Sequence, residues 1–204
     1  MHGFRGLFTA SSNVSQGDFE AYYDSLNLKQ TYPGVRAIAF IAAVKTKDLQ
    51  TFENARKADD SLVPGGNKAF KLQNISNEPL HFIGAYAADT PNLSTLGRDL
   101  TAIPGRSSIY NNALKSNGYY SSGTITYAAT ATQAAAKGFF IATPVSTSDS
   151  DTPIGVVTAN FNYQDFFGAI LKTVDDDKLS LTVHDTATNE LIYWSGEKTA
   201  GDNA

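Results

Sequence analysis

The chain has 204 residues, of which 42% are hydrophobic and 18% charged, so it is long and apolar enough for one large globular domain or two small ones. A net charge of −4 without a basic stripe argues against nucleic acid as a partner. The absence of cysteine excludes disulfides and thiolate metal sites, and no apolar run reaches the length of a membrane-spanning helix. No secretory signal sequence begins the chain, and we expect it to be part of a longer protein.

Two helices are predicted in the first thirty residues. Phe4, Leu7 and Phe8 have the i, i+3, i+4 spacing of one apolar stripe, which predicts the end of a helix over residues 3–12 with this face against protein. Ser15 with Asp18 three residues later predicts an N-cap and a capping-box partner for a second helix. That helix is expected to end before residues 32–34, which read Tyr-Pro-Gly.

The rest of the chain alternates apolar runs with turn residues. Helices are predicted over residues 45–60, 104–116 and 163–174, and strands over residues 35–44, 80–85, 119–127, 138–145, 154–162, 179–184 and 191–194. Short turns between the late strands favour antiparallel pairing, so the predicted class is α+β. The first four strands are expected in one antiparallel sheet and the last three in a second, with the chain dividing near residues 146–152.

The strand that begins at Leu80 is apolar on both faces, which is typical of a central strand. It runs into Asp89, in the turn sequence Ala-Asp-Thr-Pro-Asn. Asp89 could be a recognition carboxylate or could only begin an Asx turn. Further on, Gly97 is expected to supply a turn and Asp99 to cap the following segment, with ligand contact as the alternative for Asp99.

Motifs of catalysis and of cofactor or metal binding are missing from the sequence. It contains no G-x-S-x-G elbow, no P-loop and no dinucleotide-binding glycine motif. His2, His81 and His184 lack metal-ligand spacing. We therefore expect no catalytic residue, no metal and no cofactor. A Ser/His/Asp site assembled from distant residues stays open as an alternative, and it would need His81 or His184 in an open cleft.

Several segments, in their order along the chain, resemble the CHASE domain, the extracellular sensor module of membrane-bound histidine kinases and cyclic-dinucleotide enzymes. They are the segments FRGLFTAS (4–11), Val14-Ser15 followed by Phe19 and Tyr22 (14–22), YPGV (32–35), LGRDL (96–100), GFFIATPV (138–145) and GVV (155–157). The resemblance covers nearly the whole chain. It implies an N-terminal stalk helix with linker over residues 1–31, a membrane-distal PAS-like ligand-binding domain over residues 32–147, and a membrane-proximal PAS-like domain over residues 148–204.

The resemblance also implies a position for the ligand. In the plant relatives, which are similar to cytokinin receptors, an aspartate just after a core strand contacts an adenine-type hormone, and Asp89 matches it best. Many bacterial members have Glu-Pro near this point, whereas this chain has Ala-Ala-Asp-Thr-Pro at residues 87–91. The ligand is therefore not set by the family. The remaining candidates to line the pocket are aromatic or hydroxyl side chains: Tyr86, Phe40, Phe140, Ser122 and Thr124. Core packing is the alternative for the aromatic ones.

We expect this chain to be a sensor rather than an enzyme. An unknown small molecule would bind the distal domain, and a homodimer formed through the stalk helix would pass the signal across the membrane to which the full-length protein is tethered. The domain would lie in the periplasm or outside the cell. A histidine kinase of a two-component system, or a diguanylate cyclase, would form the cytoplasmic output. The alternatives are a secreted hydrolase with a non-sequential Ser/His/Asp site and a dimerisation module without a ligand.

Overall fold

The structure is a computed structural model, and it describes residues 1–32, 34–88, 95–127, 135–172, 180–186 and 188–195. Its centre is a six-stranded antiparallel sheet in the order β2-β1-β6-β5-β3, with β4 also paired to β5. The strands of this sheet are β1 (Val35–Lys45), β2 (Leu80–Ala88), β3 (Tyr120–Ser121), β4 (Ile125–Tyr127), β5 (Ala136–Thr147) and β6 (Ser150–Asn162). The predicted α+β class with antiparallel sheets is confirmed.

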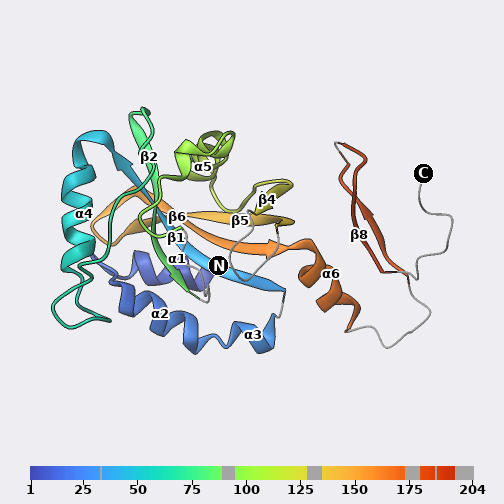
Figure 1. Cartoon of the computed structure of the whole chain (residues 1–204). Helices are drawn as coiled ribbons and strands as arrows, with labels where there is room; N and C mark the ends of the chain where they lie inside the picture. The colour runs from blue at the N-terminus through green and yellow to red at the C-terminus, as the bar shows by residue number, and fades with distance from the viewer. Residues whose placement is uncertain (33, 89–94, 128–134, 173–179, 187, 196–204) are drawn as a thin grey trace.

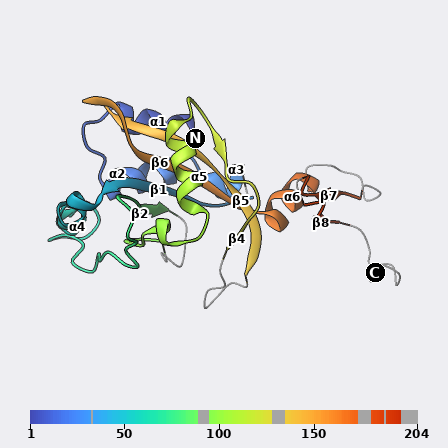
Figure 2. The same ribbon diagram turned by 90° about the horizontal axis from the view of Figure 1, so that it is seen from above.

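Helices cover both faces of the sheet (Figure 1). Helices α1 (His2–Thr9), α2 (Gln16–Ser25) and α3 (Leu28–Thr31) lie on one face, and α5 (Arg106–Lys115) lies on the other, where Figure 2 shows it crossing over the strands. Two short 3-10 helices, η1 (Thr46–Asp48) and η2 (Leu100–Ala102), precede α4 (Leu49–Ala58) and α5. Helix α4 lies at one end of the sheet and α6 (Tyr163–Leu171) at the other. No helix in the described ranges is long and apolar enough to cross a membrane.

The predicted assignment of residues 154–162 to a second sheet is wrong. These residues belong to β6, which pairs antiparallel with β1 on one side and with β5 on the other, so β6 lies inside the first sheet. The tight turn between Thr147 and Ser150 joins β5 and β6 as a hairpin. Strands β7 (Thr182–His184) and β8 (Leu191–Trp194) do form a separate two-stranded sheet. The domain boundaries at 31/32 and 147/148 stay predictions.

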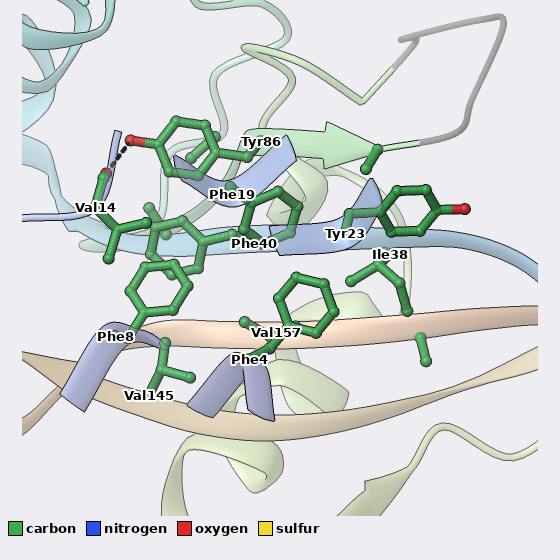
Figure 3. Packing of buried hydrophobic residues seen from close by; sticks show 14 of the residues in the cluster. Phe4, Phe8, Val14, Phe19, Tyr23, Ile38, Phe40, Tyr86, Val145 and Val157 are labelled. Atoms are coloured by element: carbon green, nitrogen blue, oxygen red, sulfur yellow. Dashed lines mark hydrogen bonds between the residues drawn. The ribbon is translucent and has the colours of Figure 1, made fainter. Parts of the chain in front are cut away.

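The stripe of α1 is buried against the sheet, as predicted. Phe4 and Phe8 are 1% and 2% exposed, and Leu7 is partly buried against the same core. Phe8 lies 4.6 Å from the ring of Phe40 in β1, and Phe19 of α2 packs against Phe4 at 5.0 Å, measured between ring centroids. Figure 3 shows these aromatic side chains pointing into one layer between α1, α2 and the strands. Because α1 is too short to be stable alone, this packing is what holds it helical.

The start of α2 is set by local sequence. The Ser15 hydroxyl accepts a hydrogen bond from the Asp18 backbone N–H, and the Asp18 carboxylate accepts from the Ser15 backbone N–H at 2.9 Å. These reciprocal bonds form the predicted capping box and satisfy backbone donors that a helix N-terminus leaves free. Hydrogen bonds to the Asp18 carboxylate from the Ser15 hydroxyl, at 2.7 Å, and from the Ser15 backbone N–H hold the pKa of Asp18 below its usual value.

The outer edge of β2 is covered by residues 95–99. Gly84 donates its backbone N–H to Arg98 O at 3.1 Å, and its carbonyl accepts from Gly97 N at 2.8 Å. A Cβ on Gly84 would lie 1.9 Å from Thr95 O, so a glycine is required in this strand for the covering segment to approach. This cover removes an exposed strand edge that could pair with another chain.

Replacing Phe8 with alanine tests how much the α1 packing contributes. Phe8→Ala removes a large buried side chain, so the free energy of unfolding should fall by about 3–5 kcal/mol in urea denaturation. The control is Arg5→Ala on the exposed side of the same helix, which should change it by about 0.5 kcal/mol or less. Equal effects for the two variants would show that the stripe does not support the fold.

Candidate functional site

The face of the sheet under α5 carries an aromatic stack. Tyr110 of α5 is 4% exposed, and its ring lies between Phe82 of β2 and Phe140 of β5, at centroid distances of 5.1 and 5.4 Å. The rings of Tyr110 and Phe140 are nearly parallel, with an angle of 16° between them. Offset stacking of this kind is a favoured geometry for aromatic pairs. The stack fixes α5 on the sheet and places the Tyr110 side chain in its core.

Arg106 is the first residue of α5 and brings a positive charge to the same place. Arg106 and Tyr110 are four residues apart, which puts them on one side of the helix. The Arg106 Cζ lies 5.3 Å from the centroid of the Phe140 ring, and the side chain is half-buried. A guanidinium over an aromatic face is attracted by the ring electrons.

Tyr127 of β4 completes the group, which we call the α5-side cluster (Arg106, Tyr110, Tyr127 and Phe140). The Tyr127 hydroxyl donates to Phe139 O at 2.8 Å and lies 3.3 Å from Asn160 Oδ1 of β6. Arg36 Cζ lies 4.9 Å from the centroid of the Tyr127 ring. The cluster thus joins one helix and two strands that are far apart in sequence.

Burial changes the acid–base properties of both tyrosines. It raises the pKa of Tyr110 to about 12, against a smaller lowering by the charge of Arg106. Burial also raises the pKa of Tyr127, again opposed by the charges of Arg106 and Arg36. A buried phenol is easier to keep neutral than ionised. Both hydroxyls are therefore hydrogen-bonding groups at neutral pH rather than bases.

The predicted pocket aromatics lie on both faces of the sheet. Phe140 belongs to the α5-side cluster, whereas Phe40 and Tyr86 lie in the core under α1 and α2. There the Tyr86 hydroxyl donates to Val14 O at 2.7 Å (Figure 3). The structure therefore does not bring Phe40 and Tyr86 together with Phe140, and their role in binding stays a prediction. Asp89, the predicted recognition carboxylate, lies outside the described residues.

The two predicted hydroxyl residues are hydrogen-bonded within the protein. Ser122 Oγ accepts from Phe140 N at 2.9 Å and donates to Gly123 O at 2.8 Å, which ties the β3–β4 connection to β5. Thr124 Oγ1 donates to Asp185 Oδ2 at 2.5 Å and lies 2.8 Å from the hydroxyl of Tyr163 in α6. Ser122 therefore borders Phe140, and Thr124 connects the sheet to the C-terminal hairpin. Contact of either hydroxyl with a ligand stays a prediction.

A second polar group is buried under the segment that covers β2. Asp99 and His81 are both 0% exposed, and Asp99 Oδ2 lies 2.8 Å from His81 Nδ1. Asp99 also accepts hydrogen bonds from the backbone N–H groups of Ser76 and Thr101, each at 2.9 Å. The bond to Thr101 N caps η2, which confirms the predicted capping role of Asp99.

This buried pair does not have the form of a hydrolytic site. In a Ser/His/Asp triad the serine and the carboxylate bind opposite nitrogens of the histidine. Here Ser76 Oγ and Asp99 both lie on Nδ1, at 3.3 and 2.8 Å, while Nε2 faces Thr46, whose hydroxyl donates to Glu78 O. His81 is inaccessible to a substrate, and the exposed His184 lies with Nδ1 3.2 Å from Asn189 O. No group of three potential metal ligands occurs among the described residues.

Asp99→Asn tests the structural role of the buried carboxylate. Desolvation raises the pKa of Asp99, but the hydrogen bonds from Thr101, Ser76 and His81 outweigh it and hold the pKa below its usual value. The ionised carboxylate therefore stabilises the fold above the unfolded-state pKa of about 3.9, and this contribution is lost as the pH falls through the folded-state pKa. At pH 7 the free energy of unfolding of the variant, measured by urea denaturation, should be about 2–3 kcal/mol lower than that of the wild type.

The difference between Asp99→Asn and the wild type should narrow as the pH falls below about 4. The control is the exposed Asp24→Asn, which should follow the wild type throughout. An Asp99→Asn variant with unchanged stability but altered ligand affinity would instead identify Asp99 as a binding residue.

Sequence reasoning missed three residues of the α5-side cluster: Arg106, Tyr110 and Tyr127. The spacing of Arg106 and Tyr110 on the predicted helix of residues 104–116 was a usable signal for two of them. No local pattern connects this pair with Tyr127, because only the pairing of β4 with β5 brings Tyr127 to the same face.

Comparison with known proteins identifies the family. The CHASE domain family matches residues 12–193. No curated protein matches the chain. Among solved structures, the crystal structure of the periplasmic sensory domain of the Campylobacter jejuni chemoreceptor Tlp1 is similar at 12% sequence identity and a TM-score of 0.44, over 96% of this chain. The chain spans 62% of that domain. Because the family match spans nearly the whole sequence, the chain belongs to the CHASE domain family, whose members are extracytoplasmic sensor modules.

Proposed function

We propose that this chain is the ligand-sensing domain of a transmembrane receptor, and that it binds a small molecule on the α5 side of its sheet. Family membership supports the sensor role. The observation that carries the position of the site is the α5-side cluster, where Arg106 and the Tyr110 hydroxyl lie among buried aromatic rings. Small-molecule sites typically combine an apolar lining with a few polar groups that orient the ligand.

The opposite face of the sheet is less suited to a ligand. Its core under α1 and α2 is filled by aromatic side chains, and the Tyr86 hydroxyl there already donates to Val14 O.

The contacts of the C-terminal hairpin offer a route for a signal. Strand β4 carries Tyr127 of the cluster, and Thr124, just before β4, donates to Asp185 next to β7. Lys137 of β5 pairs with Glu190 just before β8. Binding beside Tyr127 could therefore favour one position of the β7–β8 hairpin. A ligand shifts such an equilibrium only if its affinity differs between the two arrangements.

In the full-length protein we propose that this domain lies in the periplasm or outside the cell, tethered to the membrane, and works as a homodimer through α1. The output would be a cytoplasmic module such as a histidine kinase or a diguanylate cyclase. The Phe4–Phe8 stripe is already buried against the sheet, so the partner subunit would contact the outer side of α1, which includes Arg5 and Thr9.

Asp89→Ala tests the carboxylate that directly follows β2 in the sequence. Amines, purines and amino acids are screened by thermal shift, and a ligand that binds is titrated by calorimetry. If Asp89 contacts the ligand, the variant should bind about ten- to a hundredfold more weakly, because a charge-assisted hydrogen bond is lost. Its melting temperature without ligand should change little. The exposed Asp60→Ala is the control. Unchanged affinity with a lower melting temperature would make Asp89 a turn residue.

Cysteine cross-linking tests the dimer. These 204 residues contain no cysteine, so Arg5→Cys and Thr9→Cys, in a full-length receptor whose cysteines elsewhere are replaced, introduce single thiols on the outer side of α1. Mild oxidation in membranes should give covalent dimers for at least one of them, because a disulfide requires Cα atoms within about 7 Å. Asp60→Cys is the control and should stay monomeric. Monomers for all three would contradict a dimer through α1.

A further inference from the structure

We propose that the α5-side cluster recognises a carboxylate group on its ligand, with the Arg106 guanidinium as the charged partner and the Tyr110 hydroxyl as a second donor. This inference rests on the proposed function, because it takes the α5 side of the sheet as the place where the ligand binds. It adds the chemical class of the ligand.

The first observation is that Arg106 has no anionic partner among the described residues. It is half-buried over the Phe140 ring, and it forms no ion pair with any carboxylate in the part of the chain that the structure describes. Arg56, in contrast, has a carboxylate partner. It also lies over a core ring, that of Tyr86 at 4.9 Å, but its Nη1 is 3.7 Å from Asp59 Oδ2. A guanidinium held on the protein without a counter-charge is suited to a carboxylate, with which it can form two parallel hydrogen bonds.

The second observation is the Tyr110 hydroxyl. Tyr110 is 4% exposed, and its hydroxyl has no hydrogen-bond partner among the described residues. In contrast, the Tyr127 hydroxyl bonds to Phe139 O, and the Tyr86 hydroxyl to Val14 O. Among the described residues, the buried side-chain atoms without a partner are Arg56 Nε and Arg98 Nε, so the Tyr110 oxygen is not sealed in the core and is open to an acceptor on a ligand. Its raised pKa keeps the proton on the oxygen, which makes Tyr110 a donor.

The third observation is the sign of the surrounding charge. The charge of Arg106 acts on both Tyr110 and Tyr127. Arg106 is also the first residue of a ten-residue helix, whose N-terminus adds a partial positive charge. A cationic group would be repelled here, whereas a carboxylate would be attracted. The rings of Phe140 and Tyr127 beside it favour a ligand whose remaining part is planar or apolar.

Benzoate is the probe, and benzamide is its neutral counterpart of nearly the same shape. Both are titrated into the whole chain and followed by thermal melting and by saturation-transfer NMR of the probe. At a benzoate concentration about ten times its Kd, the melting temperature should rise by about 3–6 °C. Benzamide at the same concentration should cause no rise.

Four variants locate the effect. Arg106→Gln should weaken benzoate binding at least tenfold, and Arg106→Lys should recover part of it, because lysine keeps the charge but not the paired donors. Tyr110→Phe keeps the ring stack and removes only the hydroxyl, and it should weaken binding about three- to tenfold. Lys47→Gln, in the exposed η1, removes a positive charge elsewhere and should leave the affinity unchanged. Melting without probe checks that every variant is folded.

The outcomes separate this inference from the proposed function. If amines or purines bind and depend on Tyr110 but not on Arg106, while benzoate does not bind, the carboxylate inference is wrong and the sensor proposal stands. Benzoate binding that is equal in Arg106→Gln and wild type also overturns the inference. If benzoate and every compound of the other classes fail to bind the whole chain, both proposals fail.

Discussion

The apolar character of both faces of the two central strands is the constraint on which the fold depends. In β1, Ile38, Phe40 and Ala42 point to one side and Ala39 and Ile41 to the other, and all five are buried. β6 repeats the pattern beside it. A sheet with two apolar faces must be covered on both, since either face left in water would lose the free energy of burial. Helices α1 and α2 cover one face and α5 the other, and every other element is placed by that arrangement.

The layer between the sheet and helices α1 and α2 differs in chemistry from the layer between the sheet and α5. Under α1 and α2, β6 contributes Val157 and Ala159, and the layer is aromatic and aliphatic. On the α5 side the same strand contributes Thr158 and Asn160, which hydrogen-bond to each other and to the backbone of β1. Strand alternation puts Val157 and Ala159 on one side of β6, and the apolar Val156 with the polar Thr158 and Asn160 on the other. This second side is the one that Arg106 and the Tyr127 hydroxyl face.

The buried Asp99 helps to position helix α5, although it does not touch the α5-side cluster. Its carboxylate holds His81 of β2 and the backbone of Ser76, and it caps η2. The hydroxyl of Thr101 in turn accepts a hydrogen bond from the backbone N–H of Phe82 at 2.9 Å. Helix α5 begins four residues after η2, so the hydrogen bonds that fix η2 also help to fix the position of Arg106. None of the residues in these hydrogen bonds belongs to the α5-side cluster. A buried ion with several hydrogen bonds is well suited to such a role, because each bond fixes one direction.

Local features were readable from the sequence because their causes are local. The capping box of Ser15 and Asp18, the stripe of Phe4 and Phe8, and strand β8 each depend on residues within a few positions of one another. The positions of most strands followed from apolar runs for the same reason. An exception is the predicted strand of residues 119–127, which Gly123, with a φ of 65°, divides into β3 and β4.

Which strands pair, and which side chains share a face, was decided by the tertiary structure. β6 was assigned to the wrong sheet because its partner β1 lies more than a hundred residues earlier, and nothing in either strand specifies the other. Phe40 and Phe140 looked equivalent as apolar strand residues, yet they lie on opposite faces of one sheet. The α5-side cluster unites residues 106, 110, 127 and 140 through a helix crossing and a strand pairing. The sequence by itself determined the local elements and, through an ordered set of segments, the family. The site depends on long-range packing, whose free energy comes from the combined burial of distant segments and is not encoded in any one of them.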